Sequence, residues 1–173
     1  MKIICFILVD LCVTICELVK GLYEMKYYLR NITEKDKNFI YNIKKLSIIN
    51  CVQKIWGWDE EYQIKDFKSD FILENFIIII VEGKDIGFIQ IVEEPPNINI
   101  AEIHIIPNYQ GYGIGSSIIS SIIEQASNKM KTVTIGCFID NFRAKNLYKR
   151  LGFEVIKKTD THYEMRYQPK KNL

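Results

Sequence analysis

One stretch, residues 98–126, constrains the fold of this chain more than any other. The run from Ile98 to Ile106 is rich in β-branched apolar residues and predicts a buried strand, which Pro107 and Asn108 end. From Gly113 onward, apolar residues recur at helical spacing. These residues are Ile114, Ile118, Ile119, Ile122, Ile123 and Ala126. The sequence therefore predicts a strand, a glycine-rich turn and an amphipathic helix in direct succession.

The glycine-rich turn has the composition of an anion-binding site. Gly111, Gly113 and Gly115 leave no Cβ atoms at the start of the predicted helix, so a ligand can approach the backbone. The first N–H groups of a helix lack partners and carry the positive end of its dipole, which favours a phosphate or pyrophosphate. Two common nucleotide-binding motifs do not match this turn. A P-loop needs a lysine where Ser116 stands, and the dinucleotide fingerprint spaces its glycines differently.

A different motif does fit the turn. Gln110, Gly113 and Gly115 match the pattern Gln/Arg-x-x-Gly-x-Gly, which resembles the acetyl-CoA-binding motif of the GNAT superfamily of N-acetyltransferases. A downstream segment resembles that superfamily's N-x-x-A-x-x-L-Y-x-x-x-G-F signature. Its matching positions are Asn141, Ala144, Leu147, Tyr148, Gly152 and Phe153. The resemblance covers residues 26–168 and implies an α/β (α+β) fold, with a mixed, mostly antiparallel central sheet flanked by helices.

Composition is consistent with one such domain. A chain of 173 residues, 48% hydrophobic and 25% charged, has an ordinary globular balance. Its formal net charge is +2 and its basic residues are scattered, so we expect no nucleic-acid partner. Five cysteines form no C-x-x-C pair and only two histidines are present, so we expect no metal site. We interpret the cysteines as reduced, buried thiols and expect a cytoplasmic protein.

Residues 1–24 differ from the rest of the chain. Asp10 and Glu17 interrupt an otherwise apolar run, whereas a transmembrane helix needs roughly 20 residues with few charges. A signal peptide needs an uninterrupted apolar region, which is also missing. We therefore expect Met25 to be the natural start, residues 1–24 to be translated upstream sequence and residues 25–173 to form the N-acetyltransferase domain. An appended amphipathic helix and a membrane anchor are the alternatives.

The remaining pattern predicts the other elements. A capping box at residues 33–36 opens a helix that ends near Asn50, and a second helix runs from Asp59 to about Phe71. A hairpin turn falls at residues 83–85 and another at 159–161. The resemblance implies a first strand at residues 26–30. The other expected strands span residues 76–82, 86–93, 131–138, 153–158 and 163–167, and a last helix spans 141–151.

The loop between the first two helices has an unusual composition. Trp56 and Trp58 flank a glycine, and Asp59, Glu60 and Glu61 follow. Acidic residues at the start of a helix accept hydrogen bonds from its free N–H groups and interact favourably with the positive end of its dipole. These acids therefore have a purely structural interpretation. The resemblance implies that this loop lines the acceptor pocket. In that interpretation the two tryptophans form an aromatic wall, and Glu60 or Glu61 holds a cationic amine.

The resemblance also implies the binding mode of acetyl-CoA. Backbone N–H groups of the glycine-rich turn should bind the pyrophosphate. The strand edge at Ile103 and Ile105 should pair with the pantetheine amides, as an added strand would. The full expected set is Ile103, Ile105, Gln110, Gly111, Tyr112, Gly113, Ile114, Gly115, Ser116, Asn141, Ala144 and Tyr148.

Acetyl transfer to an amine needs a neutral amine, stabilisation of the developing oxyanion and a proton for the leaving thiolate. Tyr148 matches the family tyrosine taken to be the general acid, and a phenol of pKa about 10 keeps its proton at neutral pH. The identity of the general base stays open. Glu102 and His104 share a strand face unless a β-bulge intervenes, and Glu60, Glu61 or no base are the alternatives.

The predicted function follows from these assignments. We expect transfer of an acetyl group from acetyl-CoA to a primary amine of a small molecule, such as a polyamine or an aminoglycoside. Attack would be direct, in a ternary complex of a monomer or homodimer without a metal. An acetyltransferase acting on a protein N-terminus or lysine is one alternative, and a non-catalytic acyl-CoA-binding regulatory module is the other.

Overall fold

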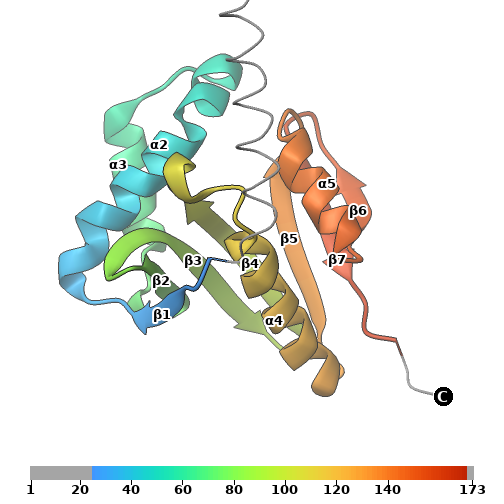
Figure 1. The fold of residues 1–173 in the computed structure, drawn as a ribbon. Helices are drawn as coiled ribbons and strands as arrows, with labels where there is room; N and C mark the ends of the chain where they lie inside the picture. Colours follow the sequence, from blue (N-terminus) through green and yellow to red (C-terminus); the bar gives the residue numbers. More distant parts are fainter. Residues whose placement is uncertain (1–24, 171–173) are drawn as a thin grey trace, which may run out of the picture.

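The computed structural model describes residues 25–170, so the predictions made for residues 1–24 lie outside the described part of the chain. Helices α2, α3, α4 and α5 surround a seven-stranded sheet, with α4 in front of it in Figure 1 and α5 beside β6 and β7. Within residues 25–170, no helix is both long and apolar enough to span a membrane.

The elements follow the predicted order with small shifts at their ends. The strands are β1 (Tyr28–Asn31), β2 (Phe76–Val81), β3 (Lys84–Glu94), β4 (Asn97–Ile105), β5 (Thr132–Phe138), β6 (Glu154–Lys158) and β7 (His162–Tyr167). The helices are α2 (Lys37–Ile55), α3 (Glu60–Asp70), α4 (Ile114–Asn128) and α5 (Phe142–Arg150), with short 3-10 turns at Glu34–Asp36, Leu73–Asn75 and Pro107–Tyr109. Helix α2 therefore extends past the predicted end at Asn50.

The sheet has the strand order β1-β2-β3-β4-β5-β7-β6. Strands β4 and β5 run parallel, and every other neighbouring pair is antiparallel, which confirms the predicted mixed, mostly antiparallel sheet. The parallel pair requires a crossover, and α4 supplies it. The predicted strand–turn–helix unit of residues 98–126 is this crossover and the strand before it.

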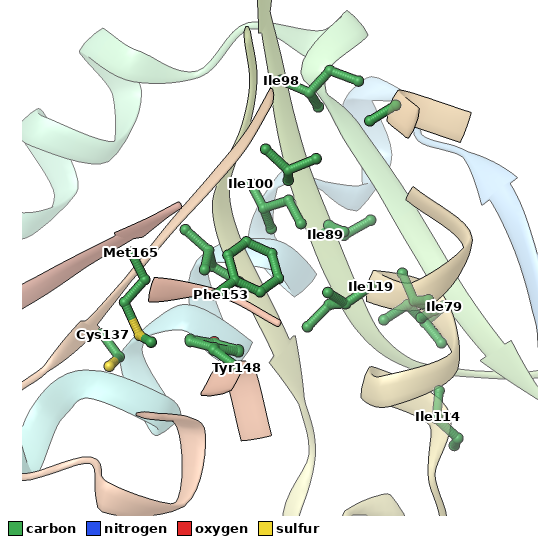
Figure 2. Close-up of a cluster of buried hydrophobic side chains, with 14 of the residues drawn as sticks. Ile79, Ile89, Ile98, Ile100, Ile114, Ile119, Cys137, Tyr148, Phe153 and Met165 are labelled. Carbon is green, nitrogen blue, oxygen red and sulfur yellow. The ribbon is translucent and has the colours of Figure 1, made fainter. Parts of the chain in front are cut away.

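Two apolar clusters cover the two faces of the sheet. Ile78 and Phe88 belong to the cluster under α2 and α3, whereas their neighbours Ile79 and Ile89 belong to the cluster under α4. Successive strand residues point to opposite faces, so the continuous apolar run of β2 is buried on both sides. Figure 2 shows the α4-side cluster, in which Tyr148 of α5 lies beside Cys137 and Met165.

Strands β4 and β5 separate halfway along their length. Their pairing extends only from Asn97–Thr132 to Ile100–Ile135. At that point Ala101 has no partner in the β3 ladder, because Gln90 pairs with Glu102 and Ile91 with Ile100, and the extra residue forms a β-bulge. Beyond the bulge, β4 continues to pair with β3, and β5 with β7. One edge of β4 at residues 102–105 therefore has no strand partner among residues 25–170.

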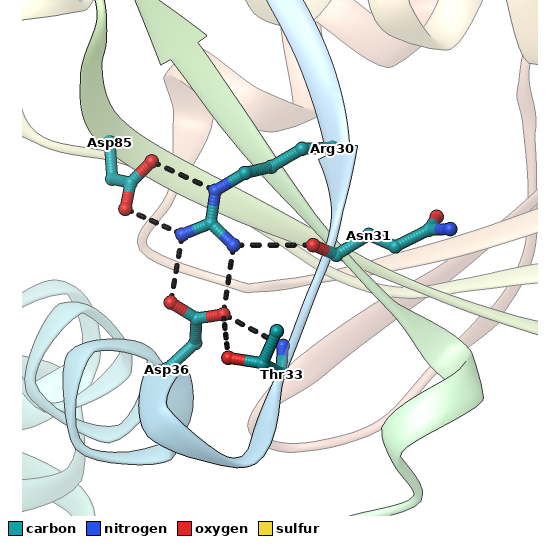
Figure 3. Close-up of polar contacts among 5 residues, drawn as sticks. All are labelled: Arg30, Asn31, Thr33, Asp36 and Asp85. Atoms are coloured by element: carbon teal, nitrogen blue, oxygen red, sulfur yellow. Dashed lines mark hydrogen bonds and ion pairs between the residues drawn. The ribbon is translucent and has the colours of Figure 1, made fainter.

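An ion-pair cluster fixes the first strand to the rest of the sheet (Figure 3). The Arg30 guanidinium donates to both carboxylate oxygens of Asp85 at 3.2 and 2.6 Å, and to both of Asp36 at 2.8 Å. Asp36 also accepts from the Thr33 backbone N–H at 2.7 Å, which is the predicted capping box. Arg30 holds the pKa of the Asp36 carboxyl well below its usual range. The cluster links β1, the 3-10 turn before α2, and β3.

Candidate active site

Two cavities meet at the point where β4 and β5 separate. The larger, of about 1030 Å³, lies between the first two long helices and the ends of β4, β5 and β7. The smaller, of about 420 Å³, lies between the glycine-rich turn and α5. Five residues line both, namely Ile103, Ile105, Gln110, Asn141 and Tyr148. A ligand in one cavity can therefore reach a ligand in the other beside Tyr148.

The start of α4 forms one wall of the smaller cavity. Gly113 is the N-cap residue of α4 with φ +81°, and Gly111 has φ +90°, both in the left-handed region that favours glycine. No side chain of residues 25–170 caps this helix start. The first N–H groups of a 15-residue helix are thus available to an anion.

Arginines supply further positive charge to the smaller cavity. Arg143 and Arg150 line it, and its described lining contains no Asp or Glu. The Arg143 Nη1 donates to Gln110 Oε1 at 3.3 Å, and Gln110 Nε2 donates to the Ile105 carbonyl at 2.7 Å. The side chain of Gln110 therefore ties the turn to the end of β4. Sequence reasoning missed Arg143, although it lies inside the second motif, between Asn141 and Ala144.

Most of the residues predicted to bind the cofactor gather around this cavity. Asn141 caps α5 by accepting a hydrogen bond from the Ala144 N–H at 3.0 Å. Tyr112 alone of the predicted set is not in the cavity wall. The others line it, namely Ile103, Ile105, Gln110, Gly111, Gly113, Ile114, Gly115, Ser116, Asn141, Ala144 and Tyr148. An uncapped helix start, two arginines and an unpaired strand edge fit the pyrophosphate and the amide-bearing arm of acetyl-CoA.

Tyr148 lies where the two cavities meet. Its side chain is 6% exposed, and its ring packs against Phe153 with a centroid distance of 6.0 Å. Its hydroxyl makes no hydrogen bond with any residue of the described range, yet it lines both cavities. Burial, with a smaller effect of Cys137, raises the pKa of Tyr148 far above its usual value. The phenol is therefore protonated at neutral pH and faces the junction.

Glu102 and His104 lie together on the wall of the larger cavity. The bulge at Ala101 precedes both residues, so they keep the same face, and Glu102 Oε2 is 3.1 Å from His104 Nε2. Lys44 Nζ of α2 is 2.6 Å from Glu102 Oε1. Burial alone would raise the pKa of Glu102, but His104 and Lys44 together outweigh it, so the pKa lies below its usual value. Glu102 is ionised at neutral pH.

Of the four residues predicted to line an acceptor pocket, one lines the larger cavity and three do not. Trp56 lines the larger cavity and stacks on His162 with a centroid distance of 6.5 Å. Trp58, Glu60 and Glu61 are not part of its wall. Instead, Glu60 accepts hydrogen bonds from Lys45 at 2.7 Å, Trp58 Nε1 at 2.7 Å and the Tyr41 hydroxyl at 3.1 Å, which joins α2 to α3.

Two other acids of the same region do line the larger cavity. Asp59 and Asp66 contribute to it, together with Tyr62. Asp59 also caps α3 by accepting from the Tyr62 N–H at 3.0 Å, as the structural interpretation of the sequence expected. With Glu102, three carboxylates line this cavity, and Lys44 is the one Lys or Arg in its described wall. The larger cavity is therefore acidic, whereas the smaller one is basic.

Comparison with solved structures identifies the class of fold. The PaiA N-acetyltransferase of Thermoplasma acidophilum, solved in complex with coenzyme A, superposes with a TM-score of 0.66 at 16% identity, covering 83% of this chain and 99% of that chain. The fold is thus that of the N-acetyltransferases. The model of the acetyltransferase (GNAT) family matches residues 39–153. The chain belongs to the GNAT family, as its two motifs predicted.

Sequence relatives match shorter segments. An uncharacterized N-acetyltransferase of Methanocaldococcus jannaschii is 33% identical over 89 residues, which are 47% of this chain and 39% of the relative. A thialysine N-epsilon-acetyltransferase of Mus musculus is 33% identical over 73 residues, 42% of this chain and 43% of the relative. The match thus spans less than half the length of these curated relatives.

Proposed function

We propose that this protein transfers an acetyl group from acetyl-CoA to a primary amine of a small molecule. One observation carries the proposal. A basic cavity suited to a pyrophosphate and an acidic cavity suited to a cationic amine meet beside Tyr148, a largely buried tyrosine that lines both. Membership of the GNAT family supports the same reaction.

The residues that would hold acetyl-CoA follow the smaller cavity. Backbone N–H groups at the start of α4 would bind the pyrophosphate, with Arg143 beside them. The unpaired edge of β4 at Ile103 and Ile105 would hydrogen-bond the pantetheine amides. Bound in this way, acetyl-CoA supplies an activated acetyl thioester at the cavity junction. No described group of His, Cys, Asp and Glu residues has the arrangement of a metal site.

Two residues would then move protons. The Tyr148 hydroxyl donates its proton to the departing sulfur, since its raised pKa keeps it protonated until then. Glu102, ionised and 3.1 Å from His104, accepts a proton from the amine directly or through a water. The amine attacks directly, so a covalent acyl-enzyme is not needed.

The shape and charge of the larger cavity favour a small cationic acceptor. Asp59 and Asp66 can bind a second positive charge of the acceptor, and Trp56 and Tyr62 can cover its carbon chain. A polyamine or an aminoglycoside has this chemistry. The mouse relative is named for acetylation of thialysine, also an amine-bearing small molecule, which supports this class over a protein acceptor.

The first test is calorimetric titration of the full chain with acetyl-CoA. Gly113→Glu adds a side chain at positive φ and a negative charge at the helix start, so it should abolish binding. Gln125→Glu adds the same charge on an exposed part of α4 outside both cavities, so it should leave binding intact. Equal affinity in both variants would contradict the binding mode.

The second test measures turnover. Free thiol release from acetyl-CoA would be followed with a panel of polyamines, aminoglycosides, amino acids and peptides with free N-termini. Acetylation of a small cationic amine is the expected result. Preference for the peptides would instead support a protein N-terminus or lysine as the acceptor. Binding of acetyl-CoA without turnover of any amine would support a non-catalytic module.

A further inference from the structure

An amine of the protein itself already lies beside the candidate base. Lys44 Nζ is 2.6 Å from Glu102 Oε1, and both side chains are 20% exposed. Lys44 points from α2 into the larger cavity, the same cavity that Tyr148 lines from the opposite side of the split sheet. A primary amine in direct contact with the candidate base is the arrangement that the proposed reaction requires of its acceptor.

The neighbouring lysines of the same helix differ from Lys44 in this respect. Lys45 pairs with Glu60 at 2.7 Å, and Lys54 pairs with Asp140. Neither of them lines the larger cavity. Lys44 is thus the one lysine of the described chain that shares the cavity with Glu102 and Tyr148.

We propose that Lys44 is a self-acetylation site of this protein, a proposal that depends on the acetyltransferase function argued above. The tether of the helix holds Lys44 at an effective concentration far above that of a free amine, which offsets the cost of breaking its ion pair. Lys44 is then an internal acceptor when no external amine fills the larger cavity.

The step balances in atoms and protons. The Lys44 ammonium first gives one proton to Glu102, and its neutral nitrogen then forms a bond to the acetyl carbon while the carbon–sulfur bond of the thioester breaks. The sulfur takes the Tyr148 hydroxyl proton. The second proton lost by the nitrogen returns to Tyr148, and Glu102 releases its proton to water. The products are acetyl-lysine, the free thiol of coenzyme A and one proton.

Acetylation would change the charge of the acceptor site. It removes the one Lys or Arg charge of the described cavity wall and with it the lysine partner of Glu102, while the carboxylates of Asp59 and Asp66 stay in that wall. Glu102 loses one of the two groups that lower its pKa, so its pKa should rise. Self-acetylation would therefore make Glu102 a stronger base and the cavity more acidic.

The test uses the purified full chain with acetyl-CoA and no added amine, followed by intact-mass measurement and peptide mapping. The expected result is one acetyl group on Lys44, at a rate that does not depend on protein concentration. Lys44→Arg keeps a cation beside Glu102 but should not be acetylated. Lys45→Arg is the matched control, since Lys45 lies outside the cavity, and it should be acetylated at Lys44 as in the unaltered protein.

A second readout needs no acetyl donor. The titration of Glu102 would be followed by NMR in Lys44→Gln, which resembles acetyl-lysine in having no charge, and in the unaltered protein. The pKa of Glu102 should be higher in Lys44→Gln. An unchanged titration would contradict the ion pair on which the proposal rests.

The outcomes separate this proposal from the proposed function. Acetylation of added amines with Lys44 unmodified would overturn self-acetylation and leave the acetyltransferase function standing. Modification spread evenly over surface lysines would also overturn it, because that pattern indicates uncatalysed chemistry. If acetyl-CoA binds but neither Lys44 nor any amine is acetylated, both proposals fail.

Discussion

Gly87 offers a sharp test of how closely two strands of the site approach each other. This buried glycine of β3 pairs with Ile105 of β4, the strand that carries Glu102 and His104. A Cβ atom at position 87 would lie 2.1 Å from the His104 carbonyl oxygen and 3.0 Å from the Ile105 Cα. Both are backbone atoms, so no side chain can turn aside to make room.

The size of the effect follows from that distance. A carbon–oxygen contact is comfortable at about 3.3 Å, so Gly87→Ala must open the gap between the strands by roughly 1.2 Å. Overpacking of this kind costs about 1–3 kcal/mol, and here it also strains the β3–β4 hydrogen bonds. In a domain of this size, a loss of 2 kcal/mol in unfolding free energy lowers Tm by about 4–8 °C.

Gly136→Ala is the matched control. Gly136 also lies in a strand, β5, but a Cβ there would be 3.4 Å from the Tyr163 carbonyl oxygen, an ordinary contact. Thermal and urea unfolding of the full chain should show a clear loss of stability for Gly87→Ala and almost none for Gly136→Ala. Equal stability of the two variants, within about 0.5 kcal/mol, would refute the close approach of β3 to β4. Acetyl-CoA affinity should fall in parallel in Gly87→Ala, because the displaced residues belong to the edge of β4 that we propose binds the cofactor.

Three further predictions concern single side chains. Tyr148→Phe should lower kcat about 10²-fold or more, because it removes the proposed general acid. Its affinity for acetyl-CoA, measured by calorimetry, should stay the same. An unchanged kcat would contradict the role of Tyr148 as general acid. Arg143→Ala should weaken acetyl-CoA binding by about 10- to 10²-fold, since hydrogen bonds to charged groups contribute ~1.5–3 kcal/mol. Arg166→Ala, on the exposed side of β7, should leave the affinity unchanged. The low pKa of Asp36 means that its contribution to stability is present above the carboxyl's unfolded pKa and is lost as pH falls towards the folded pKa. Urea unfolding would be measured at pH 7 and at pH 3. The free energy of unfolding should fall less on acidification in Arg30→Met than in the unaltered protein. Equal falls would exclude the ion pair as the cause.

The fold could be predicted because its determinants are local in the sequence. The continuous apolar run of β2, the apolar spacing of α4 and the glycine-rich turn can each be recognised within about a dozen residues of sequence. The turn matters most, because φ values of +90° at Gly111 and +81° at Gly113 admit little except glycine. Family resemblance then ordered these elements into a sheet. The strand bounds differ from prediction by only a few residues.

The groups that the sequence could not reveal are those defined by contacts between distant elements. Lys44 pairs with Glu102, which lies 58 positions later in the sequence (102 − 44 = 58). Nothing in the residues around Lys44 distinguishes it from Lys45, which pairs with Glu60 instead. Gly87 is constrained by the backbone of β4, not by a turn of its own. The bulge at Ala101 depends on the register of two strands. Such features require the tertiary structure.

Helical phase determines which acids at the start of α3 and along it line the larger cavity. Glu60 and Glu61 attract attention because they follow two tryptophans. At about 100° per residue, however, Asp59 and Asp66 lie nearly two full turns apart and so share one face, with Tyr62 between them. That face lines the larger cavity, whereas Glu60 lies about 100° round the helix and meets Lys45 of α2. Because Asp59 also caps the helix, its position fixes the phase of every later residue. The helix start therefore determines which carboxylates line the larger cavity, where we propose that the acceptor amine binds.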